Sequence, residues 1–227
     1  MIRHFICLAN SKKYGERCIA GIEIELDKAK GTYRIIRNGQ VPQWIRPVSD
    51  SEHGEVGEVA ADLVESISLN DIVELDIITE APKGYQSENM LFNPKSIEIA
   101  SKIKPSEKAL DNLVREGCLN LFGNKGAAIH PDAIDSIGFS ILLIKVGKPI
   151  AYRKETDYNG KKSIQLRMKF KFNGNDYDLA VTDLDFIKEF ELNDSVLDSF
   201  SIFYLTISLG VIYNGWYHKL VAGVIMI

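Results

Sequence analysis

Between residues 163 and 172 the chain alternates apolar and polar residues, and several of the polar ones are cations. A period of two is typical of a β-strand whose apolar side chains share one face and whose cations share the other. Same-face residues stand about 6.6–6.8 Å apart, a spacing that can follow the phosphates of a single nucleic-acid strand. The alternative is a solvated outer face whose lysines guard a sheet edge. The cations of this predicted strand are Arg167, Lys169 and Lys171.

Other basic and aromatic residues could extend a nucleic-acid interface. Three cations belong to a polar loop between the first two predicted strands and could hold a phosphate, although such loops are also ordinary turns. Trp44 and Arg46 share a strand face and could stack a base; alternatively, Trp44 packs in a core and Arg46 covers its edge. Lys125 lies in a glycine-containing turn that either contacts a phosphate or serves as a connector. These candidates, with two from the predicted hairpin near 160, are Lys12, Lys13, Arg17, Trp44, Arg46, Lys125, Tyr158 and Lys161.

Patterns for catalysis and metal binding are weak in this sequence. Asp183 and Asp185 lie two residues apart, a spacing that a Mg²⁺-dependent nuclease could use, but no matching set of lysines or histidines accompanies them. We therefore expect both to be surface charge. The four histidines and three cysteines have no zinc-ligand spacing. The sequence thus predicts no cofactor, no metal and no enzymatic activity.

The charge balance excludes a uniformly basic protein. The chain has 227 residues, with 27 lysines and arginines against 31 aspartates and glutamates. Residues 1–49 and 145–171 are basic, whereas 50–80 and 172–200 are acidic, so a basic block precedes an acidic block twice. This order indicates two similar units. Without a signal-peptide pattern or a stretch that could span a membrane, and with three cysteines that fit free thiols, we expect a cytoplasmic protein.

Most of the secondary-structure signals indicate β-strands. The dipeptide Asn-Gly occurs four times, and both of its positions tolerate the positive φ of a tight hairpin turn. Helical spacing is found at 55–66 and 105–117, and the polar segment 81–93 is expected to be a loop. Besides 163–172, we predict strands at 3–9, 17–25, 32–37, 72–79, 138–146, 200–209 and 217–226.

The number and order of these elements favour a mainly β protein with few helices, folded as two small Greek-key barrels. The alternation of strands and helices that a doubly wound fold requires is absent. We expect a first barrel at 1–100, a helical connector at 101–136 and a second barrel at 137–227.

The chain also carries an ordered set of short motifs: Asn10-Ser11-Lys12-Lys13, Arg17-Cys18-Ile19-Ala20-Gly21, Trp44-Ile45-Arg46-Pro47-Val48-Ser49, Leu121-Phe122-Gly123-Asn124-Lys125-Gly126, Leu142-Leu143-Ile144-Lys145-Val146, Asp157-Tyr158, Val181-Thr182-Asp183, Ser208-Leu209-Gly210 and Lys219-Leu220-Val221-Ala222. This set resembles the prokaryotic dual OB-containing domain family over nearly the whole chain. The resemblance implies two OB-like barrels joined by a short helical segment. By analogy of fold it implies nucleic-acid recognition, together with a link to bacterial anti-phage conflict systems, and it brings no catalytic motif.

These observations predict a non-catalytic module that recognises single-stranded DNA or RNA in a bacterial anti-phage defence system. Its expected partners are single-stranded nucleic acid and an effector protein encoded nearby, with no membrane involved. The alternative is a protein-binding adaptor subunit that docks a defence effector enzyme through its acidic blocks or exposed strand edges.

Overall fold

The computed structural model describes residues 1–13, 16–27, 29–49, 61–158 and 161–227, and its contacts divide the chain into two units. Unit 1 consists of Met1–Glu116 with Gly138–Ser140, and unit 2 consists of Gly117–Ile137 with Ile141–Ile227. Residues 101–136, which we expected to connect two barrels, are shared between the units. The expected domain boundaries, with the first barrel ending at residue 100 and the second beginning at residue 137, remain a prediction.

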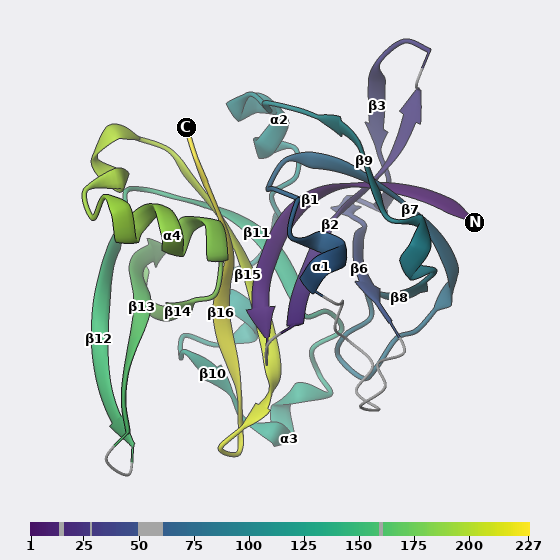
Figure 1. The fold of residues 1–227 in the computed structure, drawn as a ribbon. Coiled ribbons are helices and arrows are strands. Elements are labelled where there is room, and N and C mark those ends of the chain that lie inside the picture. Colours follow the sequence, from purple (N-terminus) through teal and green to yellow (C-terminus); the bar gives the residue numbers. More distant parts are fainter. Residues whose placement is uncertain (14–15, 28, 50–60, 159–160) are drawn as a thin grey trace. The chain divides into compact units, whose positions relative to one another are not determined.

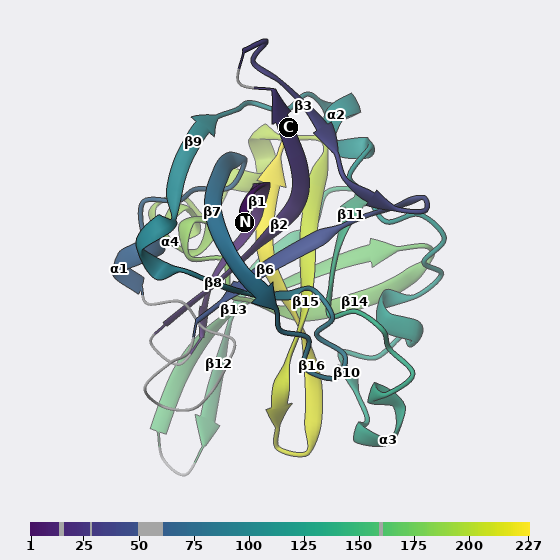
Figure 2. The same cartoon turned by 90° about the vertical axis from the view of Figure 1, so that its right-hand side faces the viewer.

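Unit 1 contains a closed barrel built from β1 (Ile2–Lys13), β2 (Glu16–Asp27), β6 (Trp44–Val48), β7 (Asp71–Glu80) and β8 (Asn89–Phe92). The strands follow the order β1-β2-β6-β8-β7, and β1 also pairs with the curved β7, which closes the barrel (Figure 2). β6 and β8 are parallel, whereas the other neighbouring strands are antiparallel. Phe5, Val73 and Leu75 are fully buried in its core.

The close approach of β1 and β2 depends on Gly21. This residue pairs with Cys7, next to a register shift between Cys7 and Ala9. A Cβ atom at Gly21 would lie 1.9 Å from the backbone oxygen of Ile6 and 2.5 Å from Cδ2 of Phe5. Only a residue without a side chain fits there, so this glycine sets how tightly the first hairpin packs.

Unit 2 contains a second barrel built from β11 (Ile141–Val146), β12 (Ile150–Tyr158), β13 (Lys161–Phe172), β14 (Asn175–Val181), β15 (Phe203–Tyr213) and β16 (Trp216–Met226). The strand order is β11-β15-β16-β14-β13-β12 (Figure 1). Only residues 147–149 separate β11 from β12, so the two act as one bent first strand whose halves lie at opposite edges of the sheet. β14 and β16 are parallel.

The two barrels therefore share one topology. Counted along the chain, the strands of each barrel lie in the order first, second, third, fifth, fourth, and the only parallel neighbours of these barrel strands are the third and the fifth. A helix lies between the third and fourth strands of each barrel, α1 (Ala61–Val64) in unit 1 and α4 (Leu184–Leu192) in unit 2. This is the Greek-key order of the OB fold. The prediction of a mainly β chain with two OB-like barrels is confirmed.

Smaller elements surround each barrel. In unit 1 they are β3 (Thr32–Ile35), β4 (Arg37–Asn38), β5 (Val41–Pro42), η1 (Pro94–Ser96), β9 (Glu98–Lys102) and α2 (Glu107–Asp111). In unit 2 they are η2 (Leu121–Gly123), β10 (Ala128–Ile129), α3 (Pro131–Ile134) and η3 (Val196–Ser199). None of the helices in the described ranges is long and apolar enough to cross a membrane.

Some predicted elements differ from the observed ones. The helix expected at 105–117 is shortened to α2, which begins after Ser106, whose side chain accepts a hydrogen bond from the Ala109 amide. Part of the helix expected at 55–66 lies outside the described residues. The segment expected as a loop at 81–93 contains β8 near its end. The polar sequence gives no sign of this strand, which forms by parallel pairing with β6. The helix α4 was not expected, because its residues belong to the second acidic block.

Candidate nucleic-acid interface

The strand β13 has the alternation that its sequence predicts. Its apolar residues Leu166, Met168 and Phe170 are buried, and the cations between them lie on the opposite face. The alternation fails at Ile164, which is 67% exposed. This end of β13 pairs only with β12, since pairing with β14 begins at Arg167. There the hairpin of β12 and β13 extends past β14 (Figure 1), so Ile164 has no core to cover.

The cationic face also carries carboxylates from β14. Arg167 donates from Nε to Asp178 Oδ1 at 2.8 Å and from Nη2 to the Asp178 backbone oxygen at 2.6 Å. Lys171 lies 3.8 Å from Asp176, and both side chains are more than three-quarters exposed. An exposed pair of this kind contributes little to stability and is easily exchanged for another anion. In this row, hydrogen bonds therefore fix the side chain of Arg167, whereas the amine of Lys171 is available to a ligand.

Tyr152 on β12 completes this face. Its hydroxyl donates to Asp178 Oδ2 at 2.6 Å, and Lys169 Nζ lies 4.8 Å from the centre of its ring. Burial alone would raise the pKa of Asp178, but hydrogen bonds from Tyr152 and Arg167 lower it, so the carboxylate stays charged. Lys154 lies across from Gln165 on the same face. Among the described side chains of this face, cations outnumber the two carboxylates.

Some candidates belong to side chains outside the described part of the structure. These are Lys13, Tyr158 and Lys161, whose backbones end β1, end β12 and begin β13.

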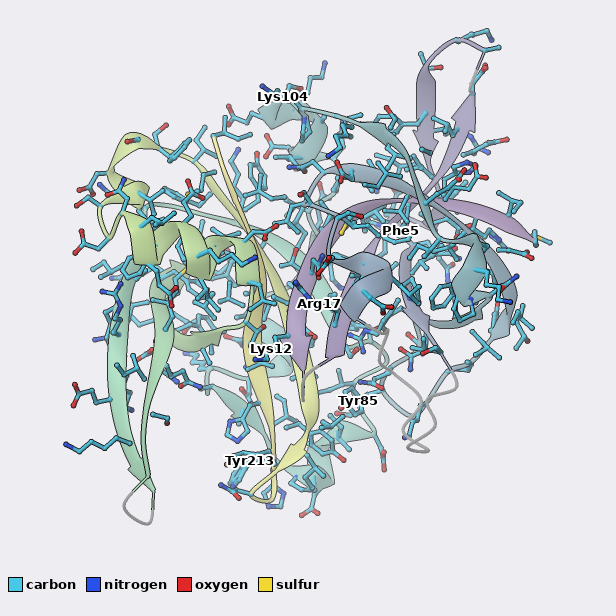
Figure 3. All side chains as sticks on the ribbon, viewed as in Figure 1. Phe5, Lys12, Arg17, Tyr85, Lys104 and Tyr213 are labelled. Carbon is cyan, nitrogen blue, oxygen red and sulfur yellow. The ribbon has the colours of Figure 1, made fainter. Side chains whose placement is uncertain are left out.

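The candidates Lys12 and Arg17 face each other at one end of unit 1. They are cross-strand partners on β1 and β2 (Figure 3). Lys12 is exposed, whereas Arg17 is half-buried and donates to Asn10 Oδ1 at 3.3 Å. Asn10 in turn donates to the backbone oxygens of Val64 and Ile67, which fixes the segment after α1. Arg17 and Asn10 therefore serve the fold, and Lys12 is the accessible cation of this cross-strand pair.

Trp44 and Arg46 lie inside unit 1, which agrees with the packing of Trp44 in a core and not with the stacking of a base. Trp44 is 8% exposed and Arg46 is 2% exposed. Arg46 Nη2 lies 3.0 Å from Glu88 Oε1 and donates to Ser140 Oγ at 2.8 Å, and the Ser140 hydroxyl donates to the same carboxylate. A strand pattern places two residues on one face without saying which face is buried. Here the partners that make burial possible lie far away in the sequence.

Lys125 is exposed in unit 2, but its neighbour Asn124 has a structural role. Lys219, 1% exposed, donates from Nζ to the Asn124 backbone oxygen at 2.9 Å and to Asn124 Oδ1 at 2.7 Å. Desolvation lowers the pKa of this amine to about 7. Two of the motifs that carry the family resemblance, at 121–126 and 219–222, are thus joined by these hydrogen bonds.

The acidic pair at Asp183 and Asp185 does not form an open metal site. Asp183 is buried, and its Oδ1 accepts hydrogen bonds from the Asp185 and Phe186 amides at the start of α4. Its Oδ2 accepts one from the Val224 amide at 2.8 Å. The carboxylate is therefore occupied by backbone donors. Within the described ranges, no three His, Cys, Asp or Glu side chains are grouped so that they could hold a metal ion.

Two exposed aromatic residues were missed by the sequence analysis. Tyr213 and Trp216 flank the Asn214-Gly215 turn between β15 and β16 and are 59% and 44% exposed. Their position beside one of the four Asn-Gly dipeptides was the available signal, because aromatic residues next to a two-residue turn have little core to pack against.

The family model described as the dual OB-containing domain matches residues 3–224, nearly the whole chain. The chain belongs to this family. The strand order of both barrels agrees with the name of the dual OB-containing domain, and the resemblance noted in the sequence is confirmed. No curated protein is a significant match for it.

Several solved structures are similar in fold to this dual OB-containing chain. One is a replication protein A heterotrimer bound to ssDNA, with 9% identity and a TM-score of 0.40. The alignment covers 100% of this chain and 48% of that one, so this chain spans about half the length of that protein. Another is the Ifi202 HINa domain in complex with dsDNA, with 10% identity, a TM-score of 0.31, and coverage of 97% and 91%. Likeness at this level carries no conclusion about ligands.

Proposed function

We propose that this dual OB-containing chain is a non-catalytic module that binds single-stranded nucleic acid, DNA or RNA, on the outer face of unit 2. The observation that carries the proposal is the row of Arg167, Lys169 and Lys171 on β13, the second strand of an OB barrel. The second and third strands of OB folds form the face that binds oligonucleotides.

The contacts of the cationic row give Arg167 and the lysines different roles in binding. Arg167 is fixed in place by Asp178 and supplies a rigid edge. Lys169, Lys171 and Lys154 are exposed and can each meet a phosphate. Because Asp176 and Asp178 offset part of the charge, we expect binding of moderate affinity that weakens steeply as salt is added.

We further propose a role in bacterial anti-phage defence beside an effector protein encoded nearby. The support for this role is the family resemblance in the sequence. A pull-down with the products of neighbouring genes tests it, and the absence of any stable complex with them would count against the effector partner.

The direct test replaces Arg167, Lys169 and Lys171 with glutamine. Glutamine is preferable to glutamate because new carboxylates opposite Asp176 and Asp178 would repel them and disturb β13. We expect weaker binding of a labelled oligothymidylate at low salt. The slope of log affinity against log salt concentration should also become shallower by about 2, because each phosphate contact on a single strand contributes about 0.7 to that slope.

A matched control removes the same number of charges elsewhere. Lys95, Lys104 and Lys108 are exposed in unit 1, and their replacement with glutamine should leave the salt slope unchanged. If the control variant and the β13 variant bind alike, the proposed face is wrong. Comparison of their thermal unfolding shows whether either change disturbs the fold.

A second candidate function is a protein-binding adaptor that docks a defence effector enzyme. The observation that favours it is the number of carboxylates on the surface of unit 2. Some of them pair with the cationic row, as Asp178 does with Arg167. Others are exposed on α4 and in the segment after it, namely Asp185, Glu189, Glu191, Asp194 and Asp198. Such a surface suits a basic partner. If the β13 glutamine variant keeps its effector while the full chain binds no oligonucleotide, the adaptor is the better description.

A further inference from the structure

The turn between β15 and β16 presents a pair of aromatic side chains. Tyr213 and Trp216 are cross-strand partners, and the two residues between them, Asn214 and Gly215, have φ of 48° and 80°. A tight two-residue turn of this kind holds its flanking residues in a defined register. The two aromatic side chains therefore project together from a rigid end of the hairpin.

Neighbouring rings brace this pair. The ring of His130 meets the ring of Trp216 edge-on, with centroids 5.0 Å apart and planes at 77°. His130 is itself placed by β10, which pairs with β16, and by its Nδ1, which accepts a hydrogen bond from the Asp132 amide. The ring of His218 lies 6.1 Å from that of Tyr213 at 61°. A T-shaped contact sets the edge of one ring against the face of the other and so orients both rings.

A braced, exposed and planar pair of this kind fits a flat ligand. Every nucleobase has a π-face that can stack on an aromatic side chain, whatever its sequence. In a duplex these faces are already stacked on neighbouring base pairs, so an aromatic side chain reaches them at lower cost in single strands. The turn lies at the same end of unit 2 as the end of β12 and the start of β13, the strand whose later half carries the cationic row (Figures 1 and 2).

We infer that Tyr213 and Trp216 form a stacking site for unpaired bases, which makes unit 2 selective for single strands over duplexes. The inference rests on the proposed function, and the pair takes the place of Trp44, which was expected to stack a base and is buried. Cations hold the phosphates in any sequence, and the aromatic pair distinguishes a strand with free bases from one without.

Trp216 provides its own test by fluorescence. The chain has two tryptophans, and Trp44→Phe leaves Trp216 as the single source of tryptophan emission. We expect an oligothymidylate to quench this emission, and a strand of the same length and charge without bases to leave it unchanged. Binding of the oligothymidylate, followed by anisotropy of a label on the strand, without any change in Trp216 emission would overturn the stacking site and leave the proposed function standing.

A second measurement uses Tyr213→Ala and Trp216→Ala. Each should weaken binding of the oligothymidylate about 5- to 150-fold, the range found for loss of one stacked base, with little change for the strand without bases or for a duplex. Trp216→Phe should keep most of the affinity. Leu192→Ala is the matched control, because Leu192 is a 90% exposed apolar residue on α4.

The outcomes separate the two proposals. Alanine variants that bind the oligothymidylate as tightly as the unaltered chain overturn the stacking site alone, provided that the glutamine variant of β13 loses affinity. An unaltered chain that binds no strand at low salt overturns the proposed function and the stacking site together. Preference for the duplex over the single strand also overturns the stacking site.

Discussion

Asp183 shows how burial changes the behaviour of a single carboxyl group. Burial raises its pKa to about 6, although three backbone amides donate to it. In the unfolded chain an aspartate has a pKa of about 3.9. The folded chain therefore binds the proton more tightly, and the stability that this proton adds is complete below about pH 4 and is lost as the pH rises through about 6.

We expect Asp183→Asn to remove this pH dependence. In urea unfolding, the unaltered chain should lose about 2 kcal/mol of unfolding free energy between about pH 4 and pH 7 through this group, and the variant should lose none of it. Asp194→Asn, at an exposed aspartate beyond α4, should keep the slope of the unaltered chain. Equal slopes in all three proteins would show that another group sets the profile.

At the scale of elements, the first hairpin is limited by Gly21. A methyl group there would collide with the Ile6 backbone oxygen, which cannot move without separating β1 from β2. We expect Gly21→Ala to lower the unfolding free energy by about 3 kcal/mol, the upper end of the usual cost of overpacking. Chemical denaturation measures this, with Gly138→Ala as the control because a methyl group there meets nothing within 4 Å. Similar losses in both variants would contradict the steric argument.

Elements were predictable from sequence where the signal is local. The alternation of β13 and the Asn-Gly turns identify hairpins, because strand period and turn conformation depend on adjacent residues. The turn at 173–174 even fixes which carboxylates of β14 face the cations of β13, since it sets the register of Lys169 with Asp178 and of Lys171 with Asp176. This register makes the cationic row less open than the alternation of β13 alone indicates.

Burial, in contrast, depends on residues that are distant in sequence. Arg46 resembles a surface cation until Glu88 and Ser140 are placed beside it, and no pattern near Arg46 indicates them. The helix α4 did leave a local signal, with Asp183 as its N-cap and Phe186 and Phe190 four residues apart on one face. Its many acids hid that signal.

At the scale of the whole molecule, residues 138–140 belong to unit 1 although the chain on both sides belongs to unit 2. Ser140 bonds both members of the buried pair of Arg46 and Glu88, Ser87 donates to the Gly138 oxygen, and the Arg115 guanidinium lies 3.7 Å from the centre of the Phe139 ring. These contacts complete unit 1 with a segment that follows it in the sequence by more than twenty residues.

We expect Ser140→Ala to destabilise unit 1 by about 1–3 kcal/mol, the cost of leaving buried polar atoms without a partner. Arg46→Ala should cost more, about 3–5 kcal/mol, because the Glu88 carboxylate is then buried and uncompensated. Urea unfolding of the full chain measures both. Ser136→Ala is the control, because Ser136 is exposed and its hydroxyl bonds only a nearby backbone oxygen. Unchanged stability of the Ser140 variant would show that the hydroxyl is dispensable.

The chain therefore enters unit 2, returns to unit 1 for three residues, and leaves again. During synthesis, the N-terminal barrel emerges from the ribosome before Ser140 does. The guanidinium of Arg46 therefore lacks its hydrogen bond to Ser140 until translation has passed that residue. Because domains generally fold as they emerge, this delay links the maturation of the first barrel to the arrival of the second.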